Sequence, residues 1–341
     1  MFSPEQYRAL REGAALVDRS DRGRLRLSGA DRRDYLQGLL TNDIVALTAG
    51  MGCYACLLTA QGRMVSDMYV LETGSDILID LEGFVAGAIA EHLERFIFSE
   101  DVEVTNVTGS TAQLGVCGPQ SATAIERALS PTVAATDLEA MPVLGNRSMD
   151  WNGTPVILAR RDDLGVMGFD LVVALEHATA LTSALEGTGV VPVGRDVAEV
   201  RRVEAGHPVF GKDMTEDTIP LEAGIQDRAI SLTKGCYVGQ EIIIRVLHRG
   251  HGRVARRLVG LTFSSEASVP AAGTPIRSGD REIGAITSSV LSPALQRPIA
   301  MGYVHRDFVE PGTAVAILND GQVIPAVVAG LPFQVPDLSH R

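Results

Sequence analysis

The segment Lys234-Gly235-Cys236-Tyr237-Val238-Gly239-Gln240-Glu241 carries most of the chemical information in this chain. It places a thiol, a phenol, an amide and a carboxylate side by side, with glycines at two positions. Because glycine adopts backbone conformations that side chains forbid, the pattern predicts a tight loop leading into a helix or strand. A thiol beside a lysine and a run of backbone amides would have a stabilised thiolate. Cys236 is therefore a candidate reactive group, although a lone cysteine is more often a buried structural residue.

Three neighbours of Cys236 are candidate binding residues. The ring of Tyr237 suits either stacking on a flat ligand or filling a core. Gln240 and Glu241 could bind a ligand or simply cap the segment that follows. A basic cluster comes next along the chain and could receive an anionic ligand tail or form a solvated strand edge; its members are Arg245, His248, Arg249, His251, Arg253, Arg256 and Arg257.

Length and composition indicate an ordinary soluble protein. At 341 residues, two or three domains are expected. Apolar residues make up 45% and charged residues 21%, and the net charge of −12 argues against direct nucleic-acid or anionic membrane binding. No apolar run reaches the roughly 18 residues that a membrane span needs, and no secretory signal precedes the first helix. These features predict a cytoplasmic protein.

The four cysteines, at positions 53, 56, 117 and 236, are too few and too scattered for a disulfide framework. Cys53 and Cys56 have the C-x-x-C spacing, but their surroundings predict a strand. On a strand, positions three apart point to opposite faces, so the two sulfurs could not share a metal. Structural packing is the favoured interpretation for both.

The periodicity predicts an α+β region followed by a small β-barrel or sandwich. Up to about residue 186, predicted strands and helices alternate without the glycine-rich fingerprint of a dinucleotide fold. Residues 130–152 are rich in Ala, Pro and Thr and predict a connecting segment. Beyond residue 253 only short strands between Gly, Pro and Asp turns are expected; they are 253–263, 274–277, 281–288, 299–304, 314–318 and 322–329.

Glu204 is the best-argued ligand position. A capping box from Asp196 to Glu199 is expected to begin a helix that ends before Gly206. Glu204 then lies on the apolar stripe of the last turn, where the helix dipole disfavours a negative charge. A carboxylate in such a place needs a partner, which is either Arg201 or Arg202, or a ligand with two adjacent donors.

Asp67 follows the Gln61-Gly62 turn among apolar neighbours. A buried carboxyl there could serve as a general acid or an electrostatic anchor for a ligand nitrogen. The alternative is an aspartate that only caps a turn.

The segment KGCYVGQE is similar to the hallmark of the YgfZ-type folate-binding proteins, relatives of the glycine-cleavage T-protein (GcvT, aminomethyltransferase). Other stretches carry the resemblance in the same order along the chain. They are VDRSDRGRLRLSGADRRDYLQGLLTND from Val17, LLTAQGRMVSD ending at Asp67, RRVEAGHPVFGKD from Arg201, and GRVARRLVGL and IGAITSS near the C-terminus.

The resemblance implies a GcvT-like folate-binding region over residues 1–245, built of two intertwined α+β subdomains, one of them about 51–140. A C-terminal barrel over 246–335 is expected to follow. The implied cofactor is tetrahydrofolate or a one-carbon derivative, with Glu204 on the pterin and Asp67 near the nitrogens that exchange the one-carbon unit. Tyr237, Gln240, Glu241 and Arg245 are expected around the same cofactor. T-proteins tend to carry paired acids at Asp67, whereas Ser66 precedes it here.

The resemblance also implies a function. YgfZ-type proteins are associated with assembly or repair of iron–sulfur clusters in client enzymes, including radical enzymes that modify tRNA. T-proteins generally lack a cysteine at position 236, which favours a thiol-dependent accessory role. A folate-dependent aminomethyltransferase is the alternative, and a module that only senses folate is a third possibility.

Overall fold

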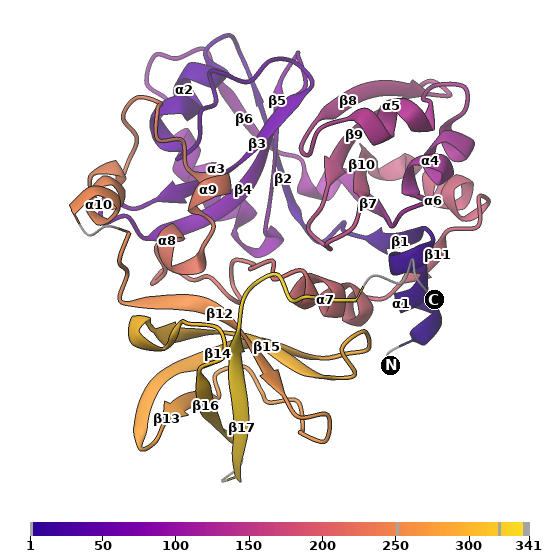
Figure 1. The fold of residues 1–341 in the computed structure, drawn as a ribbon. Coiled ribbons are helices and arrows are strands. Elements are labelled where there is room, and N and C mark those ends of the chain that lie inside the picture. Colours follow the sequence, from indigo (N-terminus) through magenta and orange to yellow (C-terminus); the bar gives the residue numbers. More distant parts are fainter. Residues whose placement is uncertain (1–2, 250–251, 320–321, 337–341) are drawn as a thin grey trace.

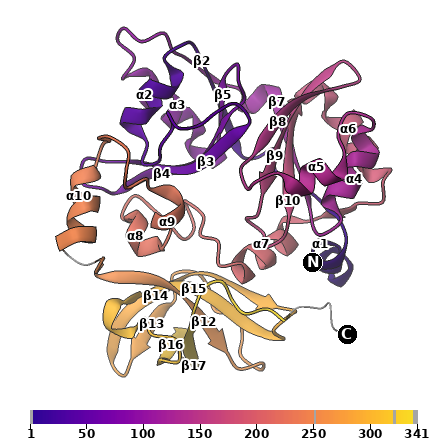
Figure 2. The ribbon, with the colours of Figure 1, turned by 45° about the horizontal axis from the view of Figure 1, so that its top comes forward.

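The computed structural model describes residues 3–249, 252–319 and 322–336. Two α+β parts lie side by side above a β-barrel, and short helices fill the space where the three parts meet (Figures 1 and 2). Within the described residues, no helix is long and apolar enough to cross a membrane.

The first part is an antiparallel five-stranded sheet in the order β3-β4-β5-β2-β6. Helices α2 (Arg32–Leu39) and α3 (Ala86–Glu94) pack against it. The strands are β2 (Gly23–Ser28), β3 (Met51–Leu58), β4 (Met64–Glu72), β5 (Ile77–Leu81) and β6 (Glu103–Asn106).

The second part is a six-stranded sheet in the order β11-β1-β7-β10-β9-β8, with one parallel pair between β1 and β11. Helices α4 (Ser121–Leu129), α5 (Ala135–Ala140) and α6 (Ala178–Glu186) and the N-terminal α1 (Pro4–Glu12) accompany it. Its strands are β1 (Ala15–Asp18), β7 (Thr111–Cys117), β8 (Asn146–Trp151), β9 (Thr154–Arg161), β10 (Gly168–Ala174) and β11 (Val191–Val193). The expected connecting segment 130–152 is therefore wrong, since it contains α5 and β8.

The two sheets divide the chain differently from the expected subdomain of about 51–140. The first sheet takes its strands from residues 23–106, while β1 and β7–β11 form the second. The chain thus leaves the second sheet after β1, builds the whole first sheet, and returns at β7. The boundary between the two α+β parts is set by the pairing of β1 with β7 and β11, which are distant in the sequence. Local sequence patterns do not predict which distant strands pair.

Short helices connect the second sheet to the barrel. They are α7 (Arg195–Glu204), α8 (Pro220–Ala223), α9 (Gln226–Ala229) and α10 (Gln240–Ile244), followed by the π-helical turn η4 (Arg245–Arg249). The expected capping box at α7 is wrong. Gly194 is the N-cap and makes no side-chain bond, while the carboxylate of Glu199 accepts from Arg202 and Lys212.

The C-terminal part is a closed six-stranded barrel, as the sequence predicts. Its strands are β12 (Arg256–Phe263), β13 (Pro275–Ser278), β14 (Arg281–Ser292), β15 (Arg297–His305), β16 (Ala314–Asn319) and β17 (Gln322–Ala329). After β17 the chain runs back over α7 toward α1, and we call residues 330–336 the C-terminal strap. Phe333 of the strap is buried, and its N–H donates to the carbonyl of Glu204.

Strand β3 shows why Cys53 and Cys56 cannot act together. Tyr54 and Cys56 belong to the core cluster at the centre of the molecule, whereas Cys53 and Ala55 pack on the opposite face, toward α2 and α3. The predicted alternation is confirmed. The alternating side chains of β3 thus contribute to two separate hydrophobic cores. The core that contains Tyr54 lies next to the candidate site.

Candidate functional site

A tyrosine and an aspartate from neighbouring strands meet at the centre of the molecule. The hydroxyl of Tyr54 on β3 donates a 2.6 Å hydrogen bond to Oδ2 of Asp67 on β4. Asp67 is half-buried, and its other carboxylate oxygen has no hydrogen bond to any described residue. Burial raises the pKa of Asp67, although the Tyr54 hydrogen bond opposes this. The carboxyl can therefore bind a ligand nitrogen either as an acceptor or as a proton donor.

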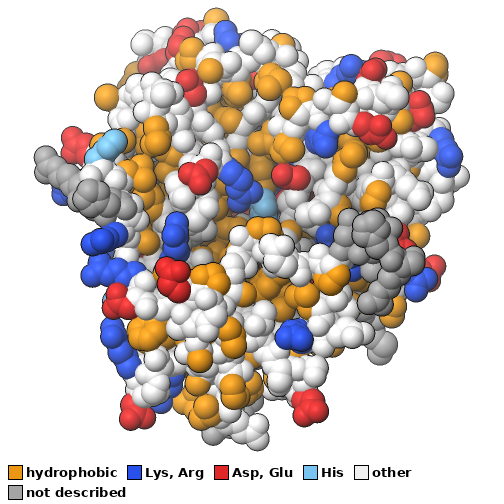
Figure 3. Space-filling view, in the orientation of Figure 1, with side chains coloured by type: hydrophobic (Ala, Val, Ile, Leu, Met, Phe, Trp, Pro, Cys, Tyr) orange, Lys and Arg blue, Asp and Glu red, His pale blue; other side chains and the backbone are white. Residues whose placement is uncertain are grey.

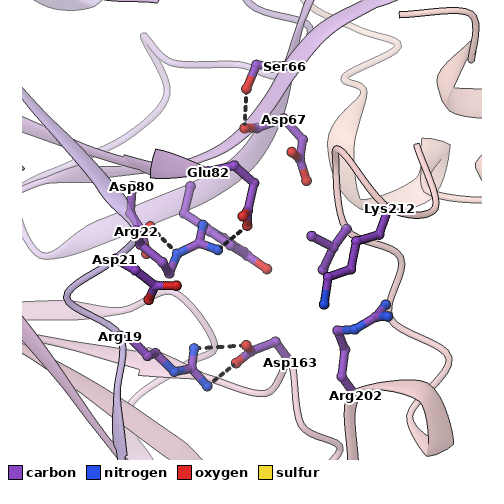
Figure 4. A network of polar contacts seen from close by, with 12 residues as sticks. Arg19, Asp21, Arg22, Ser66, Asp67, Asp80, Glu82, Asp163, Arg202 and Lys212 are labelled. Atoms are coloured by element: carbon purple, nitrogen blue, oxygen red, sulfur yellow. Dashed lines mark hydrogen bonds and ion pairs between the residues drawn. The ribbon is translucent and has the colours of Figure 1, made fainter. Parts of the chain in front are cut away.

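A network of buried ion pairs lies below this carboxyl, between the two sheets (Figure 4). Arg22 contacts Asp80 at 2.5 Å and Glu82 at 2.6 Å, and Arg161 contacts Asp80 at 2.8 Å. Arg19 is paired with Asp163 at 2.8 Å. The network joins the turn between β1 and β2, strands β5 and β9, and the loop after β9, so it fixes the two sheets relative to each other.

Stacked and hydrogen-bonded side chains extend this network toward Tyr54. The guanidinium of Arg161 lies 3.4 Å from the ring centroid of Tyr69, whose hydroxyl is 3.0 Å from Nε2 of His207. Nδ1 of His207 is 3.3 Å from Nη1 of Arg228. Burial, followed by the charge of Arg228, lowers the pKa of His207 to about 3. Because arginine only donates, Nδ1 must accept, and Nε2 carries the proton toward Tyr69.

Glu204 has protein partners on every side. Its carboxylate accepts from Tyr7 (2.9 Å), Arg201 (2.7 Å) and Ser292 (2.6 Å), and its side chain is 1% exposed. The sequence left open whether Glu204 pairs with an arginine or binds a ligand, and the structure contains the ion pair with Arg201. The carboxylate ties α7 to α1 and to β14 of the barrel, so a pterin contact at Glu204 would require one of these bonds to be exchanged.

The loop of Cys236 is held by its neighbours. The Lys234 ammonium donates to the carbonyls of Gln37 (2.6 Å), Leu40 (2.6 Å) and Asn42 (2.9 Å) at the end of α2. Burial lowers the pKa of Lys234 to about 8, although the nearby carboxylate of Asp43 opposes this shift. The Lys234 ammonium is thus bound by backbone carbonyls, and its expected effect on the Cys236 thiolate stays a prediction.

The other residues of the loop separate into buried and exposed groups. Tyr237 is buried in the same core cluster as Tyr54, and its hydroxyl has no hydrogen bond to a described residue. Cys236, Glu241 and Arg245 are exposed, and Gln240 is half-buried. The loop thus buries its phenol and exposes its thiol.

Gly239 explains how the loop docks. Its φ of +84° is the left-handed conformation that favours glycine, and it forms the N-cap of α10. A Cβ at this position would lie 2.5 Å from the carbonyl oxygen of Thr59, in the turn between β3 and β4. The predicted turn leading into a helix is confirmed, and it rests on the same hairpin that carries Asp67.

Two cavities lie between the α+β parts, the barrel and the C-terminal strap. One of about 540 Å³ reaches from His207 and Arg228 to Arg257 on β12, and the other of about 550 Å³ reaches toward Arg11 and Glu204. His207, Arg228 and Pro332 line both. The front view shows a hollow at this junction, and Lys and Arg side chains gather beside it, between α10 and the barrel (Figure 3).

The sequence interpretation missed Arg161, His207 and Arg228. His207 and Arg228 stand in stretches quoted above or next to them, yet only the fold brings β4, β9, α7 and α9 together. The only local feature of the sequence that pointed to the site was His207, which follows Gly206 just after the end of α7. Of the basic cluster, His251 lies outside the described residues, Arg256 is paired with Glu222 at 3.0 Å, and Arg257 lines a cavity.

Comparison with known proteins agrees with this architecture. Residues 2–234 match the GCVT N-terminal domain family, and residues 256–334 match the glycine cleavage T-protein C-terminal barrel domain. The aminomethyltransferases of Synechococcus sp. (strain WH7803) and Saccharopolyspora erythraea are each 29% identical to the chain, over 96% of it and 89% of their own length. The crystal structure of the glycine cleavage system aminomethyltransferase T from Bartonella henselae superimposes with a TM-score of 0.87 at 24% identity, over 96% of this chain and 88% of that one. The chain therefore belongs to the glycine cleavage T-protein family.

Proposed function

We propose that this protein binds a reduced folate at its centre and uses the exposed Cys236 thiol as an accessory factor for iron–sulfur enzymes, including radical enzymes that modify tRNA. The observation that carries the folate proposal is the Tyr54–Asp67 pair at the centre of the molecule, which leaves one carboxylate oxygen of Asp67 without a hydrogen bond to a described residue. Family membership supports the same ligand.

The residues present fit a reduced pterin. Asp67 supplies a half-buried carboxyl with a raised pKa, and the neighbouring His207 stays neutral. The rings of Tyr54 and Tyr69 pack against each other with their centroids 5.1 Å apart and form the apolar wall behind this carboxyl. A tetrahydrofolate would contribute the nitrogens that carry a one-carbon unit. Tyr54 orients the carboxyl of Asp67, and the ion pairs beneath it keep the two sheets from shifting. Glu204 as a second pterin contact remains a prediction.

The accessory role is supported by the loop of Cys236. Residues 235–255, which include this loop, lie outside both family matches. Cys236 is exposed there, whereas Cys56 and Cys117 are buried. An exposed thiol on a docked loop can reach a client protein without rearrangement of the core.

Aminomethyl transfer is the second candidate, and the curated relatives favour it, since those matched along the whole chain are named aminomethyltransferases. Tyr54 and Asp67 suit this chemistry as well. The two candidates differ in which residue is indispensable: the thiol of Cys236 or the carboxyl of Asp67.

Titration with tetrahydrofolate under anaerobic conditions tests the folate proposal. The wild type should bind, and Asp67→Asn should bind about ten- to a hundredfold more weakly, since a charge-assisted hydrogen bond contributes about 1.5–3 kcal/mol. Exposed Asp227→Asn on α9 is the matched control and should bind as the wild type does. No measurable binding by the folded wild type would refute the folate proposal.

Complementation separates the two roles. In a strain lacking its own YgfZ-type protein, Cys236→Ser should abolish rescue, because serine preserves size but supplies no thiolate near neutral pH. Asp67→Asn should retain partial rescue. The reverse ranking, with Asp67 required to form methylenetetrahydrofolate from an aminomethylated carrier and Cys236 replaceable, would establish the transferase instead.

A further inference from the structure

A groove of about 760 Å³ runs along the edge of the second sheet, between strands β1, β7 and β11 and helix α6. Its lining shares no residue with the two cavities at the centre of the molecule. The floor is apolar and consists of Leu16, Ala112, Leu114 and Pro192. Three of these side chains belong to the hydrophobic core under α4 and α6, so the floor is a rigid surface of the fold.

Helix α6 forms the polar wall of this groove. Four of its side chains line the groove at the spacing i, i+3, i+4 and i+7, which places them on one face of the helix; they are Thr179, Thr182, Ser183 and Glu186. The opposite face of the helix buries Leu181 and Leu185. The wall therefore presents three hydroxyl groups followed by a carboxylate at the last residue of the helix.

The groove has a carboxylate at each end. Asp18 follows Leu16 on the same face of β1 and lies at the end of the sheet where β10 leads into α6. The other end of β1 pairs with the start of β11, which follows α6 in the chain, so Glu186 lies at that end. The stretch of α6 from Thr179 to Glu186 spans about 10 Å at the rise of an α-helix. The two carboxylates are thus separated by the length of the groove.

The charges of both carboxylates are unbalanced. Within residues 3–249, 252–319 and 322–336, neither Asp18 nor Glu186 forms an ion pair, and both are exposed. One oxygen of Asp18 accepts from the N–H of Ser20 at 2.9 Å. The described lining contains no Lys, Arg or His, and the adjacent Arg195 is paired with Asp21 at 3.1 Å. The groove is therefore negative at both ends and apolar between them.

We propose that this groove binds a linear polyamine, which carries ammonium groups at the ends of an aliphatic chain. The terminal ammonium groups pair with Asp18 and Glu186, and the methylenes lie on the apolar floor, as lysine stems do on apolar surfaces. The hydroxyl groups of Thr182 and Ser183 accept from an inner amine. A triamine of the length of spermidine reaches both carboxylates, whereas the shorter putrescine reaches one at a time. The site is separate from the proposed folate site and does not depend on it.

Calorimetry with spermidine and putrescine at one fixed ionic strength tests the proposal. The wild type should bind spermidine about tenfold or more tightly than putrescine, consistent with one further charge-assisted contact. Asp18→Asn and Glu186→Gln should each reduce that ratio toward one, and asparagine can still accept from the Ser20 N–H. Glu94→Gln is the matched control, because Glu94 is an exposed last residue of α3 as Glu186 is of α6, and it should leave the ratio unchanged.

The contrary outcomes are distinct. Failure of the folded wild type to bind spermidine would overturn the proposal, as would equal affinities for spermidine and putrescine. Spermidine affinity that survives in the double variant Asp18→Asn, Glu186→Gln would show diffuse attraction to the net charge of −12 in place of a site. Binding of an oligolysine peptide that both substitutions weaken, with no binding of spermidine, would assign the groove to a basic segment of a protein instead.

Discussion

The centre around Asp67 and the loop around Cys236 rest on the same β3–β4 hairpin, yet they are built by opposite means. At the centre, ion pairs and aromatic stacking join elements that are distant in the sequence, and most charges are buried. The loop is fastened by one lysine and one left-handed glycine, and its thiol faces solvent. Precise positioning of a small ligand requires the first arrangement, and access for a protein partner requires the second.

Thiol labelling should reveal the largest contrast between these regions. Burial raises the pKa of Cys53 and Cys117 to about 12, so at pH 8 about one thiol in ten thousand is ionised at those sites. Cys236 is exposed and should be alkylated first, by orders of magnitude in rate. Mass spectrometry after a brief iodoacetamide pulse gives the order. Earlier labelling of Cys53 or Cys117 would contradict the assignment of Cys236 as the accessible thiol.

Removal of one carboxylate from the central network should have the largest effect on stability. Asp80→Asn leaves Arg22 and Arg161 without their shared counter-ion, and breaking such a buried pair costs about 3–5 kcal/mol. Asp217→Asn is the matched control, since Asp217 pairs with Arg63 at the surface and is 84% exposed, where about 0–1 kcal/mol is typical. Urea unfolding measures both. Similar midpoints for the two variants would show that the central network does not brace the sheets.

Acid should weaken the same network. Burial favours protonation of Asp80, but Arg22 and Arg161 outweigh it and lower the pKa of this carboxyl. A lowered folded-state pKa gives stability that is present above the unfolded-state value, near pH 4, and is lost as the pH falls below it. The free energy of unfolding of the wild type should therefore fall between pH 4 and pH 2 more steeply than that of Asp80→Asn. Parallel pH profiles would show that Asp80 does not contribute.

Glu204→Gln should produce an intermediate effect and decide the role of this residue. Glutamine can still accept from Tyr7 and Ser292, but Arg201 loses its counter-charge, so unfolding should become easier by about 1.5–3 kcal/mol. A pterin contact would also lower folate affinity about ten- to a hundredfold. Calorimetry on the folded variant separates the two. A stability loss with unchanged affinity would make Glu204 a support of α7 only.

The sequence was informative where local patterns decide the structure. Alternation separated Cys53 from Cys56, short strands between turns predicted the barrel, and the glycines of the loop indicated a turn into a helix. The sequence was not informative where the contact partners come from distant segments. Tyr7 and Ser292 reach Glu204 from the N-terminal helix and the barrel, and Lys234 donates to the carbonyl of Leu40 at the end of α2. The Arg228–His207 contact depends likewise on two loops meeting at the centre.

The two glycines of the loop offer the smallest and most local test. Alanine at Gly239 would have to adopt φ near +84° and bring its Cβ within 2.5 Å of the Thr59 carbonyl oxygen, so Gly239→Ala should destabilise by about 1–3 kcal/mol. Gly235 has open space around its Cα and no left-handed φ, so Gly235→Ala should be neutral or stabilising by about 0.4–1 kcal/mol.

Chemical denaturation combined with the alkylation rate of Cys236 distinguishes a strained loop from a detached one. If the loop lifts from the hairpin in Gly239→Ala, both the stability loss and faster labelling of Cys236 should appear, while tetrahydrofolate binding near Asp67 weakens only slightly. A strong loss of folate affinity in this variant would mean that the hairpin transmits the position of the loop to the carboxyl. The thiol and the folate site would then be coupled through β3 and β4, because the turn between those strands contacts the loop on one side and leads directly into Asp67 on the other.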